Sequence, residues 1–162
     1  MNVFEFAMQM EKDGEKFYRE IAEKTKDAGL KKIFNTLADE EVIHYNTFKN
    51  LHEKSAAKAV ESNVLDKAKN IFSEMKAKGG LQISDDTAQV EAYKKAMKAE
   101  EEAFTFYEKK ADEVENEEEK KILLTFAREE RRHYRLLENV IEFVSRPEQW
   151  LEDAEFANMD QY

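Results

Sequence analysis

The sequence predicts an all-α fold, an antiparallel four-helix bundle built from two repeated helical hairpins. Its 162 residues are 38% charged and include only 4 Gly and 1 Pro, a composition typical of long helices with solvated faces. Apolar residues recur with helical periodicity over four long segments. The second half of the chain also repeats the first half.

The first hairpin is expected at about 3–53, with helices at about 3–26 and 29–53. Asn2 is a candidate N-cap, and Glu5 stands three residues later, as in a capping box. The segment "KDAG" separates the two helices. A link this short makes consecutive helices antiparallel neighbours.

The second hairpin is expected at about 86–145, with helices at about 86–115 and 117–145. The first of these helices follows the cap-like "SDD", and the second begins with a plausible capping box, Asn116 and Glu119. The link between the helices is again short, so this hairpin is antiparallel too.

A long crossover at 54–84 joins the hairpins, and together they form one predicted bundle domain at 1–145. The crossover contains its own helical stretch, "VLDKAKNIFSEMKAK", closed by two glycines. The tail at 146–162 contains a short helix in which Trp150 and Phe156 are docking residues. They are expected to pack against the bundle or a second subunit, and we expect a homodimer.

The repeat places segment 7–45 on segment 96–134 at an offset of 89 residues without a gap. One hairpin cannot bury its apolar face alone, so two copies packing together predict the bundle. Fifteen of the 39 paired positions are identical, and in the first copy these are Ala7, Met8, Glu11, Phe17, Tyr18, Ala22, Lys31, Lys32, Ile33, Thr36, Ala38, Glu40, Glu41, His44 and Tyr45.

Composition excludes several classes of function. The formal charge of −10 disfavours nucleic acid and anionic lipid as partners. The chain has no cysteine, which excludes disulfides, thiolate metal sites and iron–sulfur centres. No uncharged run approaches the roughly 20 residues that span a bilayer, and "MNVFEFAMQMEKDGEK" does not read as a signal peptide. We expect a cytoplasmic protein.

Two Glu-x-x-His pairs, Glu41 with His44 and Glu130 with His133, occupy equivalent places in the repeat. Residues three apart on a helix lie one turn apart on nearly the same face, so each pair can reach one metal ion. The motif differs from the H-E-x-x-H of zinc proteases, because Glu40 stands where the first histidine would be.

Two further glutamates complete the pattern. Glu11 lies 30 residues before the first pair and Glu100 lies 30 residues before the second. Each precedes a tyrosine, Tyr18 or Tyr107, by seven residues, which is two helical turns along an apolar stripe. The glutamates therefore point inward, and each tyrosine is expected to donate a hydrogen bond to a ligand carboxylate rather than serve only as core.

Four inward carboxylates would repel one another, take up protons or unfold the bundle. Two divalent cations balance their charge, and two neutral imidazoles add ligands without adding charge. Oxygen-rich ligands with two nitrogens suit iron or manganese better than zinc. The predicted metal ligands are Glu11, Glu41, His44, Glu100, Glu130 and His133, holding two iron ions, with manganese possible.

Other polar residues receive simpler interpretations. Tyr45 and Tyr134 stay open between packing and radical quenching, and His52 is expected at the surface. The remaining glutamates near the motifs are expected on solvated faces or in salt bridges: Glu15, Glu40, Glu101, Glu102 and Glu129.

At these residues the sequence resembles the rubrerythrin-like branch of the ferritin-like superfamily. "AMQMEKDGEKFY" and "AMKAEEEAFTFY" are similar to the first and third helices of that branch, and "LADEEVIHY" and "FAREERRHY" to the second and fourth. The tail "RPEQWLEDAEF" is similar to tails seen there. The resemblance implies a di-iron site that reduces hydrogen peroxide or dioxygen.

The chain departs from that branch in two respects. It has no cysteine-ligated rubredoxin domain, so an external electron-donor protein is expected. The resemblance also implies an extra glutamate three residues after the ligand of the third helix, where this chain has Ala103. Alternative functions are iron handling or ferroxidase activity without catalytic turnover, and a scaffold whose cations only neutralise the core.

Overall fold

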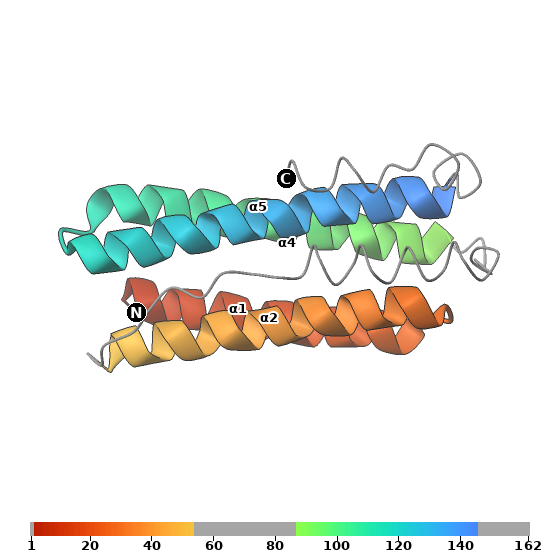
Figure 1. Ribbon diagram of the computed structural model, residues 1–162, viewed down its shortest axis with the longest axis horizontal. Helices are drawn as coiled ribbons and strands as arrows, with labels where there is room; N and C mark the ends of the chain where they lie inside the picture. Colours follow the sequence, from red (N-terminus) through yellow and green to blue (C-terminus); the bar gives the residue numbers. More distant parts are fainter. Residues whose placement is uncertain (1, 54–86, 146–162) are drawn as a thin grey trace.

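A computed structural model describes residues 2–53 and 87–145, and within these ranges it is helical without strands. The helices are α1 (Val3–Lys24), α2 (Ala28–His52), α4 (Thr87–Glu113) and α5 (Glu117–Ser145) (Figure 1). The expected all-α class is confirmed, and the observed helix ends lie within two residues of the expected ones. The crossover with its short helix and the tail with its two aromatic residues lie outside the described residues.

Side-chain caps fix three of the helix starts. Asn2 Oδ1 accepts a hydrogen bond from Glu5 N at 2.9 Å, and Asn116 Oδ1 accepts one from Glu119 N at 3.0 Å, as the sequence predicts. Asp27, within the "KDAG" break, accepts from the N–H of Leu30 at 2.9 Å and starts α2. Each cap satisfies a backbone donor that the first helical turn leaves without an intrahelical partner.

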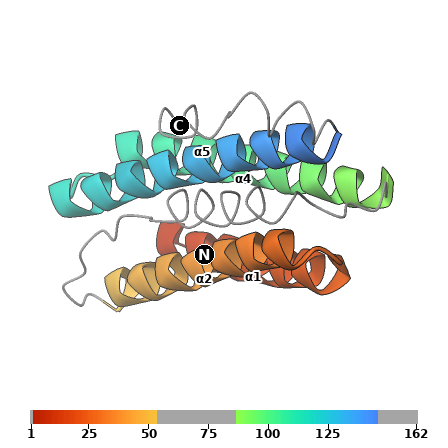
Figure 2. The same cartoon turned by 45° about the vertical axis from the view of Figure 1, so that its right-hand side comes forward.

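The two hairpins lie one above the other, and their helices run along the long axis of the molecule (Figures 1 and 2). In each hairpin the two helices are antiparallel and pack closely, α1 with α2 and α4 with α5. The hairpins face each other through α1 with α4 and through α2 with α5. Residues near the middle of all four helices therefore meet at the middle of the bundle.

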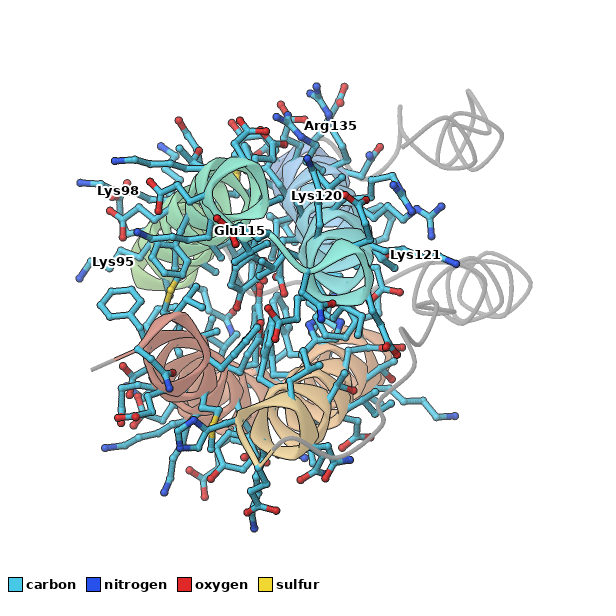
Figure 3. The ribbon with its side chains drawn as sticks, turned by 90° about the vertical axis from the view of Figure 1, so that its left-hand side faces the viewer. Lys95, Lys98, Glu115, Lys120, Lys121 and Arg135 are labelled. Carbon is cyan, nitrogen blue, oxygen red and sulfur yellow. The ribbon has the colours of Figure 1, made fainter. Side chains whose placement is uncertain are left out.

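The apolar core is divided into two clusters at opposite ends of the bundle. One is built around Phe34, Tyr93 and Phe143, and the other around Phe48 and Phe126. Within them, the rings of Phe34 and Tyr93 stack at 4.9 Å and those of Phe48 and Phe126 meet edge to face at 5.2 Å. The middle of the bundle is polar, and carboxylate oxygens gather between the four helices (Figure 3).

Charged side chains cover the outside. Lys95, Lys98 and Arg135 point away from the bundle axis (Figure 3), as a composition rich in Lys and Glu leads one to expect. Among the described residues, no helix has a stretch both long and apolar enough to cross a lipid bilayer.

Candidate metal centre

All six predicted ligand residues are buried together between the hairpins. None is more than 4% exposed, although four of the six are glutamates. Each helix contributes one or two ligand residues from its middle turns. The three-residue spacing in α2 and α5 brings each glutamate and its histidine to the same side of the helix. Carboxylates this deep would not be stable as unpaired charges. The list is Glu11 on α1, Glu41 and His44 on α2, Glu100 on α4, and Glu130 and His133 on α5.

The six residues divide into two groups of four donors, and the donor atoms of each group lie within 4.8 Å of one another. Two glutamates, Glu41 and Glu130, belong to both groups. Glu11 and His44 belong only to the first group, which is therefore Glu11, Glu41, His44 and Glu130. The second group is Glu41, Glu100, Glu130 and His133. Such an arrangement could hold two metal ions side by side, with the shared carboxylates between them.

The two histidines turn the same nitrogen toward the shared carboxylates. His44 Nδ1 lies 2.9 Å from Glu130 Oε1 and 3.4 Å from Glu11 Oε2. His133 Nδ1 lies 3.3 Å from Glu41 Oε1 and 3.4 Å from Glu130 Oε2. The imidazole rings are nearly parallel, with centroids 6.0 Å apart. Nδ1 is thus the nitrogen that each histidine offers to the centre.

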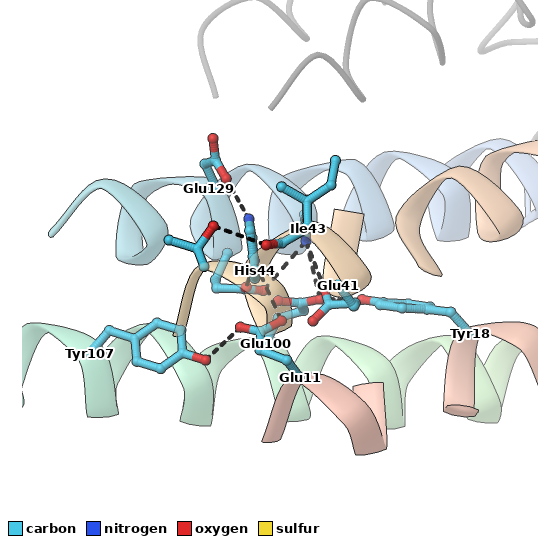
Figure 4. Close-up of polar contacts among 11 residues, drawn as sticks. Glu11, Tyr18, Glu41, Ile43, His44, Glu100, Tyr107 and Glu129 are labelled. Atoms are coloured by element: carbon cyan, nitrogen blue, oxygen red, sulfur yellow. Dashed lines mark hydrogen bonds and ion pairs between the residues drawn. The ribbon is translucent and has the colours of Figure 1, made fainter. Parts of the chain in front are cut away.

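Both tyrosines donate hydrogen bonds to ligand glutamates, and both bonds cross between hairpins. Tyr107 on α4 donates to Glu11 Oε1 on α1 at 2.5 Å (Figure 4). Tyr18 on α1 donates to Glu100 Oε1 on α4. Each tyrosine therefore fixes a glutamate of the opposite hairpin, whereas the sequence spacing had only linked it to the glutamate of its own helix.

Burial disfavours the charged form of the two shared glutamates. Burial raises the pKa of Glu41 well above its usual value, and repulsion from Glu11, Glu130 and Glu100 raises it further. Burial likewise raises the pKa of Glu130 well above its usual value, together with repulsion from Glu100 and Glu11. Close carboxylates in a medium of low dielectric constant repel one another, which favours the protonated form of each shared glutamate.

The other ligand residues ionise in pairs. Burial favours a higher pKa for Glu11, but attraction to His44 and the surrounding hydrogen bonds lower it to about 2. The pKa of Glu100 is also lowered, against the effect of burial, by hydrogen bonds and by attraction to His133. Burial disfavours the charged form of both histidines, yet the adjacent Glu11 and Glu100 raise the pKa of His44 and His133 well above the usual value.

Several donor atoms in the centre have no hydrogen-bond partner among the residues that the structure describes. They are Glu11 Oε2, Glu41 Oε1, Glu100 Oε2 and both ring nitrogens of His133. Buried polar atoms are normally paired, so a convergent set of unpaired lone-pair donors fits a bound cation. Carboxylate oxygens with two imidazoles are the ligands that iron and manganese accept. The cluster could therefore hold metal.

A cavity of about 340 Å³ lies between α1 and α4 and reaches the centre from that side. Four ligand residues line it, namely Glu11, Glu41, Glu100 and Glu130, together with other charged residues and with small residues such as Gly14 and Ala103. Gly14 and Ala103 are equivalent positions of the repeat. A Cβ at Gly14 would lie 3.0 Å from Glu41 Oε2, which is tighter than an ordinary contact.

The expectation that Glu40 and Glu129 lie on solvated faces is wrong, whereas the alternative of a salt bridge fits Glu129, which pairs with His44. Glu40 is 4% exposed and Glu129 is 1% exposed. Glu129 Oε2 lies 2.5 Å from His44 Nε2, on the far side of the ring from the centre (Figure 4). Their identity at equivalent positions of the repeat was the one sequence feature that distinguished this pair from other glutamates.

The other polar residues lie outside the centre. Glu101 and Glu102 are exposed and Glu15 pairs with Arg19, as expected. His52 is half-buried, and its Nδ1 lies 3.0 Å from Asn2 Nδ2 at the start of α1, so it contacts a helix cap.

Of the two roles left open for Tyr45 and Tyr134, packing and radical quenching, the structure favours packing for Tyr134. Both tyrosines are half-buried. The ring of Tyr134 meets Phe104 edge to face at 6.0 Å, a geometry that stabilises aromatic pairs.

A four-helix bundle with two Glu-x-x-His pairs and two further glutamates at its centre defines the class of ferritin-like carboxylate bundles. The family model for rubrerythrin matches residues 2–141, which include all six candidate ligands. The chain belongs to the rubrerythrin family. Comparisons with curated proteins and with solved structures give no significant match.

Proposed function

We propose that this protein is a di-iron oxidoreductase that reduces hydrogen peroxide or dioxygen with electrons from a separate donor protein. The observation that carries the proposal is the division of the six buried residues into two four-donor groups that share Glu41 and Glu130. When bound, two ferrous ions supply two electrons, the number that converts one hydrogen peroxide and two protons into two waters.

The residues of the chain prepare the centre for this reaction. Glu41 and Glu130 belong to both donor groups and would hold two metal ions close together when these are bound. Tyr18 and Tyr107 orient the carboxylates of Glu100 and Glu11. Burial and nearby carboxylates raise the pKa of both tyrosines well above the usual value, so each phenol keeps its proton and remains a donor.

The cavity between α1 and α4 gives a small oxidant a route to the centre. Its volume of about 340 Å³ far exceeds the roughly 30 Å³ share of one water molecule. Elsewhere the two apolar clusters close both ends of the polar layer and limit the access of water. An oxidant that enters between α1 and α4 meets the shared carboxylates directly.

The test is a reaction of the reduced, iron-loaded protein with hydrogen peroxide without oxygen, followed by optical absorption. We expect oxidation within seconds. Glu130→Ala should abolish it, because this variant loses a donor of both groups, whereas Glu101→Ala, which changes an exposed glutamate, should not. No oxidation within minutes by the fully loaded wild-type protein, with either peroxide or oxygen, refutes the proposal.

Ala103 favours a second candidate, iron handling or ferroxidase activity without repeated turnover. The residue lines the cavity at the position where the resemblance to rubrerythrins implies an additional glutamate. A methyl group cannot follow a change in iron charge as a carboxylate can. Multiple turnovers with peroxide and a reductant favour the first candidate; a single oxidation followed by retention of ferric iron favours the second.

The proposed partners follow from this chemistry. We propose a separate protein as the electron donor, because the 162 residues contain no cysteine that could ligate a redox centre of the rubredoxin type. The formal charge of −10 favours a donor with a basic surface and argues against nucleic acid or anionic membrane as partner. A homodimer stays a proposal, which sedimentation would test.

A further inference from the structure

Two buried glutamates remain after the dinuclear centre has been assembled. Glu40 on α2 and Glu129 on α5 are not needed for either four-donor group, yet they are 4% and 1% exposed. One donor atom from each of them and one from His44 lie within 4.8 Å of one another. Two oxygens that share a divalent cation at about 2.0–2.6 Å are separated by no more than about 4–5 Å, so the spacing suits a common ion.

A contact with His44 partly explains why Glu129 is buried, but no contact among the described residues explains why Glu40 is. Glu129 accepts from His44 Nε2 while His44 Nδ1 faces Glu130, so Glu129 orients a ligand of the centre. By the symmetry of the repeat, Glu40 should do the same for His133. However, His133 Nε2 has no hydrogen-bond partner, and Glu40 instead lies in the group with His44 and Glu129.

Unpaired oxygens point to the missing partner. Glu40 Oε2 and Glu129 Oε1 are both buried, and neither has a hydrogen-bond partner within residues 2–53 and 87–145. The buried polar residues among those described include no lysine or arginine that could neutralise them. Two carboxylates at this separation repel each other in a medium of low dielectric constant, and a cation bound between them would offset that repulsion.

The total charge favours the cation. Six buried glutamates, Glu40 and Glu129 with the four of the dinuclear centre, carry −6 when ionised. Two divalent ions supply +4, and one more divalent ion would balance the remaining charge of −2. The cavity between α1 and α4 includes neither Glu40 nor Glu129 among its lining residues, so this position lies apart from the proposed oxidant route.

We propose that Glu40 and Glu129 hold a third divalent cation beside the dinuclear centre, on the side where α2 faces α5. Each glutamate supplies carboxylate oxygen, and His44 Nε2–H donates to Glu129 and links the third ion to the centre. The oxygen ligands select a hard cation such as Mn²⁺ or Fe²⁺. The site goes beyond the proposed function, which needs two ions only.

The test measures stoichiometry and affinity with Mn²⁺ as the probe. Metal-free full-length protein is dialysed to equilibrium without oxygen against a series of Mn²⁺ concentrations, and bound metal is counted by elemental analysis. We expect three ions per wild-type chain at saturation and two in Glu40→Gln/Glu129→Gln. The control variant Glu23→Gln/Glu142→Gln removes the same charge from exposed positions and should retain three.

The single variant Glu40→Gln leaves the Glu129–His44 hydrogen bond intact. A loss of the third ion in this variant therefore cannot be caused by a changed orientation of His44. It should weaken the third ion at least tenfold and leave the first two unchanged. A wild-type chain that saturates at two ions, a double variant that still binds three, or a Glu40→Gln variant that loses the first two ions overturns the proposal. None of these results depends on whether the centre reacts with peroxide.

Discussion

Gly14→Ala tests how tightly the chain constrains Glu41. Gly14 lies in the interior of α1, where glycine destabilises a helix by about 0.5–1 kcal/mol relative to alanine. An alanine there should stabilise the metal-free protein by about this amount, which raises the melting temperature by a few degrees, roughly 2–4 °C per kcal/mol. The new Cβ, however, would lie 3.0 Å from Glu41 Oε2 and 3.3 Å from Glu41 Cδ.

Relief of that contact requires the Glu41 carboxylate to move by a few tenths of an ångström. The movement is cheap without metal, because the carboxylate is the flexible end of its side chain. With metal it displaces a donor that belongs to both groups. Changes around ligand residues typically weaken metal binding about 10–100-fold, and we expect a loss near the lower limit, about tenfold for each ion.

The assay combines thermal unfolding of the metal-free protein with equilibrium dialysis against Mn²⁺. Ala103→Gly is the matched control, because it makes the reverse change at the equivalent position of α4. It should lower the melting temperature without weakening metal binding. If Gly14→Ala stabilised the metal-free protein and bound Mn²⁺ as tightly as the wild type, the contact with Glu41 would not be the reason why glycine occupies position 14.

Three further predictions concern the same centre. Tyr107→Phe leaves Glu11 Oε1 without its donor and should weaken one ion about 10–100-fold, measured by Mn²⁺ dialysis; unchanged affinity for both ions would show that the phenol is only packing. Glu130→Ala should lose both ions by elemental analysis, whereas Glu11→Ala should lose one, because Glu130 belongs to both donor groups and Glu11 to one; equal losses would contradict the assignment. The raised pKa values of the two shared glutamates and two histidines mean that the folded, metal-free protein binds more protons than the unfolded chain. Its melting temperature should therefore fall as pH rises from about 5 to about 9, while metal uptake strengthens and releases protons; a metal-free melting temperature that rises over this range would refute the assignment of protons.

The periodicity and the repeat were sufficient to predict the four helices and their pairing. Helix boundaries follow from local rules, such as the Asn2 and Asn116 caps, which involve residues three apart. The inward direction of Glu11 and Glu100 also follows from one helix at a time, because each shares an apolar stripe with its tyrosine. These features depend on short separations along the chain, and the sequence specifies short separations directly.

Contacts between hairpins could not be obtained in the same way. The tyrosine hydrogen bonds cross from Tyr18 to Glu100 and from Tyr107 to Glu11, over 82 and 96 residues of chain. Sequence spacing shows which residues share a helix face, but it does not show which residue of the other hairpin that face meets. The rotation and the separation of the packed helices decide that.

The sequence by itself determined an all-helical bundle, a duplicated hairpin and six candidate ligands, because helical periodicity and charge balance act on each helix separately. Only the tertiary structure decided that Glu41 and Glu130 are shared between two donor groups, and that Glu40 and Glu129 are buried beside His44. On an isolated helix, Glu40 is simply the neighbour of Glu41. In the folded protein, donor atoms of Glu40, His44 and Glu129 lie within 4.8 Å of one another, and that proximity exists only after the hairpins have packed.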